Sequence, residues 1–511
     1  MSYSTATIVV PARTGAVWRV LPRRWPLYAC LALCAACAFA LRLALMLELP
    51  SIHRPDEVFQ ALEPAHRLWS GFGVVTWEWR DGIRSWLFPG AIAGLMAVAS
   101  HVGPGPEIYL PVIAGALSLL SLGVVATGVA LGWRHHRLAG AVLCGVLCTV
   151  WPELVYFAPR TLSEVQAGNL LVVAAGLASV PRETLAGRRG AARDAAIGAL
   201  LGVVFALRFQ LAPAAAVVAL CAGRADVRRA WPALAAGAAL PLATLGLCDW
   251  IAWGTPFQSV WKNLVVNLVE RRSEIYGVEP PGWYLVQLVR LWGAAFLPVA
   301  LFFVLGASRA PVMALVAAAV VLPHSLIAHK EISFIYAALP PIMITAGLGT
   351  ARVLAWLRGG TGPAPQRAAL PLVLAAAGLW TAVAALTAES GLAPMWARRS
   401  AMLALLHDAR QRPDLCGVGL LGSQFLWHIT GGYAYLDRPV PLYLLHTPVR
   451  LAAARAAVNY LIVAADAAAE VGQGYEAVAG EPGWRLMRRD GSCIAADPED
   501  EINAVLARDG Q

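Results

Sequence analysis

A chain of 511 residues with 59% hydrophobic and only 14% charged residues is not a soluble protein, because soluble domains carry about 25% charged residues. Its formal net charge of +9 lies largely in short arginine-rich segments between apolar runs. The positive-inside rule explains that distribution, and no basic groove with interleaved aromatic residues suggests nucleic acid. Composition therefore predicts a polytopic α-helical membrane protein without a nucleic-acid partner.

The chain divides into a basic tail, a membrane domain and a more polar C-terminal part. Residues 1–24 carry four arginines ahead of the apolar run 25–49. This run is too long for a signal peptide, so we predict an uncleaved first span that begins in the cytoplasm. Residues 25–388 hold further apolar runs, long enough to cross a hydrocarbon core about 30 Å thick.

The charge pattern of the loops sets the predicted topology. If every apolar run crossed the membrane, the basic segment 133–137 would lie outside, against the positive-inside rule. Segment 87–102, which begins near a Phe-Pro-Gly sequence, can instead lie along the interface or re-enter. This single change puts the arginine-rich loops inside and predicts about eleven transmembrane helices. The main external loops are then 50–107 and 249–283.

Residues 389–511 are predicted to form a small external α/β domain. Apolar runs of strand length alternate there with polar and Gly/Pro-rich turns, and an alanine-rich helix precedes the third run. The runs span 417–421, 442–445 and 458–463. Cys416 and Cys493 would form a disulfide if this side of the membrane is oxidising. The other cysteines lie in or beside apolar helices, where cysteine is usually a small packing residue, so no metal site is expected.

The first external loop gathers ionisable groups between two apolar segments, and such groups beside a bilayer usually mark a site. Asp56 follows a proline that permits a helix to begin there, and it is adjacent to Glu57 and close to His53. Helix capping would explain Asp56 alone, but it leaves Glu78 and Arg84 in the same loop unexplained. An acid that accepts a proton, beside cations that hold negative charge, suits transfer from a phosphorylated substrate.

Other external segments carry aromatic and charged candidates. Trp77 and Trp79 are typical of interfacial anchors. Arg160 and Glu164 have the spacing of a surface ion pair on a helix, which competes with a role in a site. Arg208 lies at the junction of two short apolar segments. It is either a snorkelling arginine at the interface or a group that faces a cavity.

Two later segments complete the set of candidates. The loop 249–283 is rich in Trp and Tyr, and it would either anchor the interface or stack against a sugar. Segment 329–331, with the sequence His-Lys-Glu, stands where one span ends outside and the next begins. It holds one of only two lysines in the chain. Cations and helix N–H groups at that position favour an anion such as phosphate.

Taken in chain order, these motifs make the chain resemble glycosyltransferase family 22. This family comprises the dolichyl-phosphate-mannose-dependent α-mannosyltransferases of GPI-anchor and N-glycan assembly. The resemblance covers residues 40–350, and the first loop is most similar to the branch that adds the third GPI mannose. The matching segments are 53–57, 76–79, 83–85, 160–162, 249–254, 276–284 and 329–336. The chain departs from the family in an inserted Arg54 and in Arg208-Phe-Gln, where Arg-Pro-Thr is usual.

The resemblance implies a GT-C fold and a single displacement that inverts the anomeric carbon of a polyprenyl-phosphate-linked mannose. The acceptor would be a hydroxyl of a glycolipid or lipid-linked glycan, and no metal or other cofactor is implied. Asp56 would be the general base, with Glu57 orienting it or the acceptor. The donor phosphate would be bound by Arg84, His329 and Lys330. Residues that would bind or orient substrate are His53, Trp77, Glu78, Trp79, Arg160, Arg208, Tyr276, Trp283, Tyr284 and Glu331.

Two other classes of function remain open from the residues alone. A transporter or flippase of a lipid-linked or anionic solute would also have many spans, although it usually shows paired repeats, and none is evident. A membrane-anchored binding protein would leave the first loop unexplained. The scarcity of lysine and abundance of Ala and Gly indicate a GC-rich bacterial genome. We therefore expect a bacterial cytoplasmic membrane with the site facing the periplasm, or the endoplasmic reticulum membrane if the source is eukaryotic.

Overall fold

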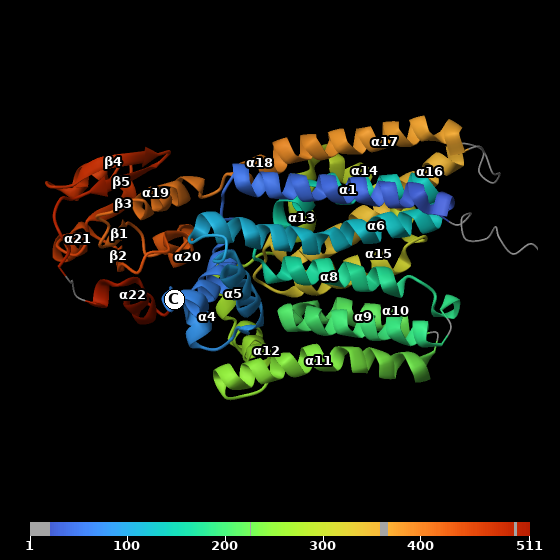
Figure 1. The fold of residues 1–511 in the computed structure, drawn as a ribbon, viewed down its shortest axis with the longest axis horizontal. Helices are drawn as coiled ribbons and strands as arrows, with labels where there is room; N and C mark the ends of the chain where they lie inside the picture. The colour runs from blue at the N-terminus through green and yellow to red at the C-terminus, as the bar shows by residue number, and fades with distance from the viewer. Residues whose placement is uncertain (1–20, 186, 225, 358–365, 495–497) are drawn as a thin grey trace, which may run out of the picture.

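The computed structural model describes residues 21–511, apart from residues 186, 225, 358–365 and 495–497. Long helices lie side by side along the longest axis of the molecule, and a small mixed domain from the last part of the chain lies at one end of them (Figure 1). We call that end of the bundle the domain end. Of the predicted tail, residues 1–20 lie outside the described part of the chain.

The bundle is built from helices that are apolar on most of their surface. Its members are α1 (Leu21–Glu48), α6 (Pro106–Val150), α8 (Ser163–Ala178), α9 (Arg188–Leu207), α10 (Ala212–Gly223), α11 (Val227–Trp253), α13 (Trp283–Trp292), α14 (Phe296–Ala307), α15 (Pro311–Leu326), α16 (Leu339–Leu357) and α17 (Gln366–Thr387). Among the described residues, seven helical stretches are long and apolar enough to cross a membrane, and three shorter apolar helices accompany them. The protein is therefore an integral, multi-pass membrane protein.

Helix α6 contains a reversal that accounts for two crossings. His136 and Arg137 leave helical geometry, with φ angles of −134° and 51°. The two halves then pack so closely that a Cβ on Gly132 would lie 2.1 Å from the carbonyl oxygen of Gly140. Only glycine permits that approach. Arg134 donates a hydrogen bond of 2.5 Å to the carbonyl that ends α8, so this basic turn lies opposite the domain end (Figure 1).

Helix α5 (Leu87–Ala99) does not belong to the bundle. Its buried residues, Ile92 and Met96 among them, pack at the domain end against the first loop and the start of α6. Figure 1 shows α5 beside α4 (Trp77–Arg80), at the domain end of the long helices. This agrees with the prediction that segment 87–102 does not cross. The predicted polytopic bundle with a small C-terminal α/β domain is confirmed.

A break between α9 and α10 places one arginine at the domain end. Arg208 has φ −153° and ψ 84°, so it interrupts the helix after Leu207. A short 3-10 turn follows, and α10 then begins with a proline in its first turn, a position that tolerates the missing N–H. The sequence predicted two short helices around this junction. The second is short, but α9 has 20 residues.

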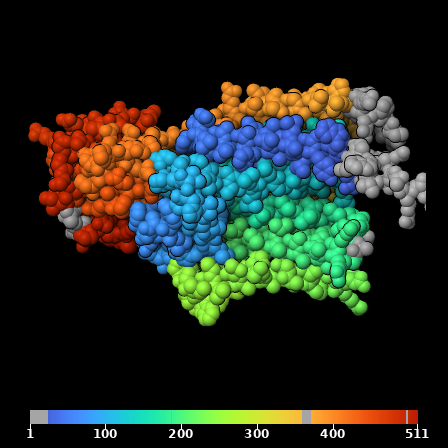
Figure 2. All heavy atoms as spheres, in the orientation of Figure 1, coloured from blue at the N-terminus to red at the C-terminus, as the bar shows by residue number. Residues whose placement is uncertain are grey.

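The first loop folds as short helices packed between the bundle and the C-terminal domain (Figure 2). It contains α2 (Pro55–Glu57), a π-helical turn over Val58–Leu62, α3 (Glu63–Ser70) and α4. Proline at the first position starts α2, and Gly71, with φ 89°, ends α3. A second segment at the domain end contains α12 (Gln258–Leu264) and a 3-10 turn over Arg272–Tyr276.

The C-terminal domain is a five-stranded sheet with helices around it, as predicted. Strand order is β2-β1-β3-β5-β4. The first three strands are parallel, and β5 runs antiparallel to β3 and β4. All residues of β1 and β2 are buried, because helices cover both faces. The elements are α18 (Ala393–Trp396), α19 (Ser400–Arg410), β1 (Val418–Leu421), α20 (Tyr433–Leu436), β2 (Leu442–Leu445), α21 (Pro448–Ala454), β3 (Tyr460–Ala464), β4 (Glu476–Glu481), β5 (Trp484–Arg488) and α22 (Ile502–Arg508).

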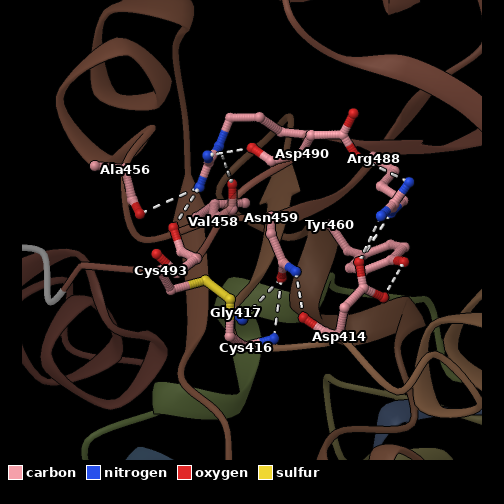
Figure 3. Close-up of a disulfide and its surroundings, with 12 residues drawn as sticks. Asp414, Cys416, Gly417, Ala456, Val458, Asn459, Tyr460, Arg488, Asp490 and Cys493 are labelled. Carbon is pink, nitrogen blue, oxygen red and sulfur yellow. Dashed lines mark hydrogen bonds and ion pairs between the residues drawn. A yellow bond between two sulfur atoms is a disulfide. The ribbon is translucent and has the colours of Figure 1, made fainter.

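Cys416 and Cys493 form the disulfide that the sequence left open (Figure 3). Beside it, the Asn459 side chain accepts hydrogen bonds from the N–H groups of Cys416 and Gly417 at 3.0 and 3.1 Å. The same amide donates to the carbonyl of Asp414 at 2.6 Å. The segment that enters β1 is thus tied by the disulfide to the segment that follows β5, and by polar contacts to the residue that precedes β3.

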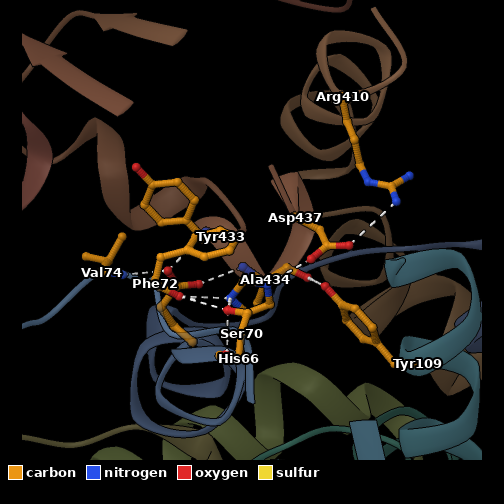
Figure 4. A network of polar contacts seen from close by, with 10 residues as sticks. His66, Ser70, Phe72, Val74, Tyr109, Arg410, Tyr433, Ala434 and Asp437 are labelled. Carbon is orange, nitrogen blue, oxygen red and sulfur yellow. Dashed lines mark hydrogen bonds and ion pairs between the residues drawn. The ribbon is translucent and has the colours of Figure 1, made fainter. Parts of the chain in front are cut away.

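The C-terminal domain is fixed to the first loop through buried polar groups. The Glu63 carboxylate accepts hydrogen bonds from the N–H groups of Val74 (2.7 Å), Tyr433 (3.0 Å) and Ala434 (2.8 Å). Nearby, His66 Nε2 lies 3.0 Å from the Asp437 carboxylate (Figure 4). Glu63 and His66 are both fully buried. Their contacts therefore fix the position of the C-terminal domain relative to the first loop.

Candidate active site

A cavity of about 350 Å³ lies at the domain end of the bundle. Its wall combines the first loop, the break after α9, the segment after α12, the turn that precedes α16, and the C-terminal domain. Of the residues predicted for the site, those that line it are Asp56, Trp77, Glu78, Arg84, Arg208, Tyr276, His329 and Glu331. The other predicted residues lie outside the wall.

Asp56 is the carboxylate of the wall that has no ionic partner. It lies partly buried in α2. No ion pair or hydrogen bond joins its side chain to any residue that the structure describes. Burial, together with the nearby carboxylates of Glu331 and Glu78, raises the pKa of Asp56 to about 7 against the opposing effect of Arg84. A carboxyl with a pKa near 7 is well suited to accept and release a proton at neutral pH.

Arg84 and Glu78 form one charged edge of the cavity. Two guanidinium nitrogens of Arg84 lie 2.6 and 3.2 Å from Glu78 Oε1. Gln60 donates to the same oxygen at 3.3 Å. These contacts orient Arg84 and leave one guanidinium nitrogen, Nη1, without a hydrogen bond to a described residue. That nitrogen is available to an anion in the cavity.

Arg208 faces the cavity and is not a snorkelling side chain. Its guanidinium lies 3.9 Å from the Glu164 carboxylate and 5.3 Å from the centre of the Phe334 ring. It is 8% exposed. No hydrogen bond within the described part of the chain occupies the N–H groups of its guanidinium. A buried guanidinium with free donors and one distant carboxylate favours an anionic ligand.

His329 and Glu331 form a second charged edge with Arg54. His329 Nε2 lies 3.7 Å from Glu331, and Arg54 lies 3.5 Å from the other oxygen of that carboxylate. Burial alone would lower the pKa of His329, but its contacts with Glu331 and the Gly277 carbonyl raise the pKa above its ordinary value. His329 is therefore more readily protonated, as the binding of an anion requires.

Lys330 lies outside the cavity wall. Its ammonium donates to the carbonyl of Glu279 at 2.8 Å and to that of Ile327. Glu331, which the resemblance implied as a residue that binds or orients substrate, contacts Arg54 and His329 and not Lys330. The cause is local geometry: the extended backbone at Glu331 (φ −132°, ψ 148°) sends adjacent side chains to opposite sides. We therefore leave Lys330 out of the proposed phosphate site.

Glu57 and Arg160 form a buried layer behind the cavity wall, together with His53. Arg160 Nη1 lies 3.0 Å from both Glu57 oxygens and 2.9 Å from the Ser51 carbonyl. The N–H of His53 also donates to Glu57, and the Tyr156 ring lies 3.9 Å from the Arg160 guanidinium. The predicted surface pair between Arg160 and Glu164 does not form. The three residues instead hold the backbone on which Asp56 stands.

The predicted aromatic residues separate into two groups. Trp77 and Tyr276 line the cavity and share a hydrogen bond of 3.0 Å. Trp79 is buried and donates to the carbonyl of Phe59 at 2.8 Å. Trp283 and Tyr284 pack into the core of the bundle. Trp79, Trp283 and Tyr284 therefore stabilise the scaffold and do not reach the cavity.

Several residues of the wall were not among the predicted site residues. Asn263 and Asn267 lie one helical turn apart after α11 and face the cavity; their spacing of four residues was the available signal. Arg399, Trp427 and His428 come from the C-terminal domain. No motif in the sequence connects these last three to the first loop, since only the tertiary fold brings residue 399 near residue 56.

The arrangement suits transfer of a group from a phosphate ester. Asp56 can accept a proton, while Arg84, Arg208 and protonated His329 present N–H donors to developing negative charge. Among the described residues, no three His, Cys, Asp or Glu side chains are grouped as ligands for a metal ion. The fold and the site thus define a polytopic membrane protein with a charged cavity at one end of its helix bundle.

Residues 33–393 match the Alg9-like mannosyltransferase family, and the chain belongs to this family. GPI mannosyltransferase 3 of Yarrowia lipolytica is 30% identical over 325 residues, which cover 60% of each chain. GPI alpha-1,2-mannosyltransferase 3 of Xenopus laevis is 28% identical over 324 residues, which cover 60% of this chain and 58% of the relative. The chain therefore matches about 60% of the length of these relatives. The resemblance inferred from the motifs is confirmed.

A solved structure supports the fold independently. ArnT from Cupriavidus metallidurans, bound to undecaprenyl phosphate, superposes with a TM-score of 0.57 at 13% sequence identity. The superposition covers 91% of this chain and 99% of ArnT. At this identity the likeness shows a shared fold, which here includes the C-terminal domain. The family match favours a transferase over the transporter alternative.

Proposed function

We propose that this protein is an inverting membrane mannosyltransferase that moves mannose from a polyprenyl-phosphate donor to a hydroxyl of a lipid-linked glycan or glycolipid. The observation that carries the proposal is the unpaired Asp56 carboxylate in a cavity that also presents Arg84, Arg208 and His329. The named activity of the relatives, α-1,2-mannosyl transfer, supports the sugar. The undecaprenyl phosphate in the ArnT structure supports a polyprenyl carrier.

The reaction is a single displacement at the anomeric carbon of the donor. Asp56 takes the proton of the acceptor hydroxyl as the oxygen attacks, and a new bond forms between that oxygen and the anomeric carbon. The bond from this carbon to the phosphate oxygen breaks, and its electron pair leaves with polyprenyl phosphate. Attack from the face opposite the leaving group inverts the anomeric configuration.

The cations act on the leaving group. Arg84, fixed by Glu78, and Arg208, near Glu164, bind the phosphate oxygens as their negative charge increases in the transition state. Protonated His329 adds a third donor, and Glu331 keeps it protonated. Trp77 and Tyr276 bound the space for the sugar. Glu57, His53 and Arg160 are positioning residues, because they hold α2 without touching the cavity.

The proposed orientation places the domain end outside. The arginine-rich turns at the opposite end would then face the cytoplasm, in agreement with the positive-inside rule. In a bacterium the cavity would open toward the periplasm, which also permits the disulfide between Cys416 and Cys493. The polyprenyl tail of the donor would lie among the transmembrane helices.

The test is sugar transfer by purified protein in detergent, with polyprenyl-phosphate-mannose and an acceptor glycolipid extract. Asp56→Asn should lower the rate of transfer by about 10²- to 10⁴-fold, the usual contribution of a general base. Asp81→Asn is the matched control, because Asp81 lies in the same loop, outside the cavity, and pairs with Arg272. Its rate should equal that of the wild type.

Each alternative outcome has a clear meaning. Full transfer by folded Asp56→Asn would remove Asp56 as the base. A wild-type protein that transfers no mannose from this donor would overturn the proposed donor or sugar, and other polyprenyl-phosphate sugars would then be compared. Translocation of a lipid-linked solute without transfer would favour the transporter alternative.

A further inference from the structure

The C-terminal domain contributes a part of the cavity wall that lies outside the family match. That match ends at residue 393, whereas Arg399, Trp427 and His428 line the cavity. Trp427 packs edge-on against Phe59 at 4.7 Å between ring centres, and Phe59 is one helical turn from Asp56. The C-terminal domain thus contributes these three residues to the same cavity that Asp56 lines, and Trp427 contacts the helix turn that follows the base.

Arg399 is a cation without an anion. No carboxylate of the described residues lies within ion-pair distance of its guanidinium. Its one hydrogen bond there, to the Ile52 carbonyl, is long at 3.4 Å. Burial, together with the neighbouring charge of Arg398, lowers the pKa of Arg399 to about 10. The guanidinium is still charged at neutral pH, so its charge is only partly compensated within the protein.

Arg399 also adopts a backbone conformation that disfavours it. Its φ angle is 66°, in the left-handed region where glycine is the usual residue. Non-glycine residues in such conformations are concentrated at functional sites. The conformation places the side chain of Arg399 between the catalytic cavity and a second hollow. That hollow, about 390 Å³ in volume, is lined by the C-terminal domain, including Met402, Ile429 and Trp484.

The aromatic residues beside Arg399 add ring faces and a neutral imidazole to this part of the wall. His428 packs against Trp427 at 4.0 Å and against Phe425 at 5.5 Å between ring centres. Burial, together with the charge of Arg399, lowers the pKa of His428 to about 4. The imidazole is therefore neutral at pH 7 and can exchange hydrogen bonds with hydroxyl groups. Aromatic faces with neutral donors are suited to sugar, and the adjacent guanidinium to phosphate.

We propose that Arg399, Trp427 and His428 form the acceptor subsite, and that it takes a glycolipid with a phosphate or phosphodiester group bound by Arg399. One end of the acceptor lies at Asp56 and presents its hydroxyl, while the rest passes Arg399 into the second hollow. This inference rests on the proposed transferase function. It makes the C-terminal domain the part of the chain that selects the acceptor.

The test compares two soluble probes, octyl α-mannoside and octyl α-mannoside 6-phosphate. Their dissociation constants are measured by isothermal titration calorimetry with the full-length protein in detergent. Wild type should bind the phosphorylated probe about tenfold more tightly or better, since charge-assisted hydrogen bonds to phosphate are strong. Arg399→Gly should remove this preference. Glycine suits the φ angle of that position, so the melting temperature of the Arg399→Gly variant should not fall below that of the wild type.

Two further variants show which arginine causes the preference for the phosphorylated probe. Arg398→Gln is the matched control, because Arg398 is the exposed neighbour and does not line the cavity; it should keep the preference. Arg84→Gln tests whether the probe occupies the donor phosphate site instead. Loss of the preference in Arg84→Gln but not in Arg399→Gly would overturn the inference, as would equal binding of both probes to the wild type.

The binding measurement is independent of turnover. A wild-type protein that shows the preference and its loss in Arg399→Gly, but transfers no mannose, would contradict the proposed function and leave the anion subsite supported. A wild type that transfers mannose but has no preference that depends on Arg399 would contradict only the inference.

Discussion

Two arginine–glutamate pairs, each with a glutamate from the first loop, differ in what surrounds them. The pair of Arg160 and Glu57 is sealed behind the loop, with side-chain exposures of 4% and 6%, and it makes further hydrogen bonds to the Ser51 carbonyl, the Ser51 hydroxyl and the backbone N–H of His53. The pair of Arg84 and Glu78, with exposures of 19% and 14%, borders the cavity and keeps a free guanidinium nitrogen. The same two residue types therefore serve the fold in one place and an anion site in the other.

The buried pair should matter most for stability. Glu57→Gln leaves the charge of Arg160 buried without its counter-ion, which typically destabilises a protein by about 3–5 kcal/mol. We expect a large fall in the melting temperature of the purified protein in detergent. Glu78→Gln, at the cavity border, is the matched control and should melt close to wild type. Equal melting temperatures for Glu57→Gln and wild type would show that the buried layer is not structural.

The cavity pair should affect the reaction and not the fold. Arg84→Gln removes a charged donor to the leaving phosphate, and such a bond contributes about 1.5–3 kcal/mol. The kcat/KM of Arg84→Gln for the donor should fall about 10- to 100-fold. Its melting temperature should equal that of the wild type. Arg67→Gln, a change in an exposed arginine of α3, controls for loss of charge in the loop. A normal rate for Arg84→Gln would exclude Arg84 from the phosphate site.

The smallest expected effect is a shift in pH dependence. The base must be deprotonated, so kcat/KM should rise as the pH passes the Asp56 pKa of about 7, and it should fall again at higher pH as His329 loses the proton that it donates to phosphate. Glu331→Gln removes a negative neighbour that raises this pKa, so the inflection should move to lower pH. Glu270→Gln, an exposed change, should leave the profile unchanged. An inflection that does not move in Glu331→Gln would show that the titrating group is not Asp56.

The contrast between the two pairs explains what the sequence could predict. Apolar runs were enough to predict the polytopic helical bundle, because hydrophobic length is a local signal. The non-crossing of segment 87–102, which rests on the charge bias of the loops, stays a prediction. The motifs were enough to predict the family and the loop that holds the proposed base. The strand runs and the small α/β domain were also predicted, since their turn residues are distinct.

Side-chain direction and long-range contacts could not be predicted from the motifs. Asp56 and Glu57 are adjacent, yet one faces the cavity and the other faces Arg160, a choice set by packing against α7 (Pro152–Phe157) and the residues that follow it. Lys330 was assigned to the donor phosphate by its position next to His329, but extended backbone directs its side chain elsewhere. The part played by Arg399 depends on a domain contact that no local pattern encodes.

The Glu63 carboxylate has a consequence for how the protein is made. It meets the N–H of Tyr433, 370 positions further along the chain, so the loop that carries the base completes its polar contacts only when most of the polypeptide has been synthesised and inserted. Until then a charged group remains exposed beside an unfinished pocket. A chain truncated before α20 could thread all its helices through the membrane and still lack an assembled catalytic centre. The last hundred residues are thus part of the assembly of the enzyme, and a premature stop there is as damaging as one in the bundle.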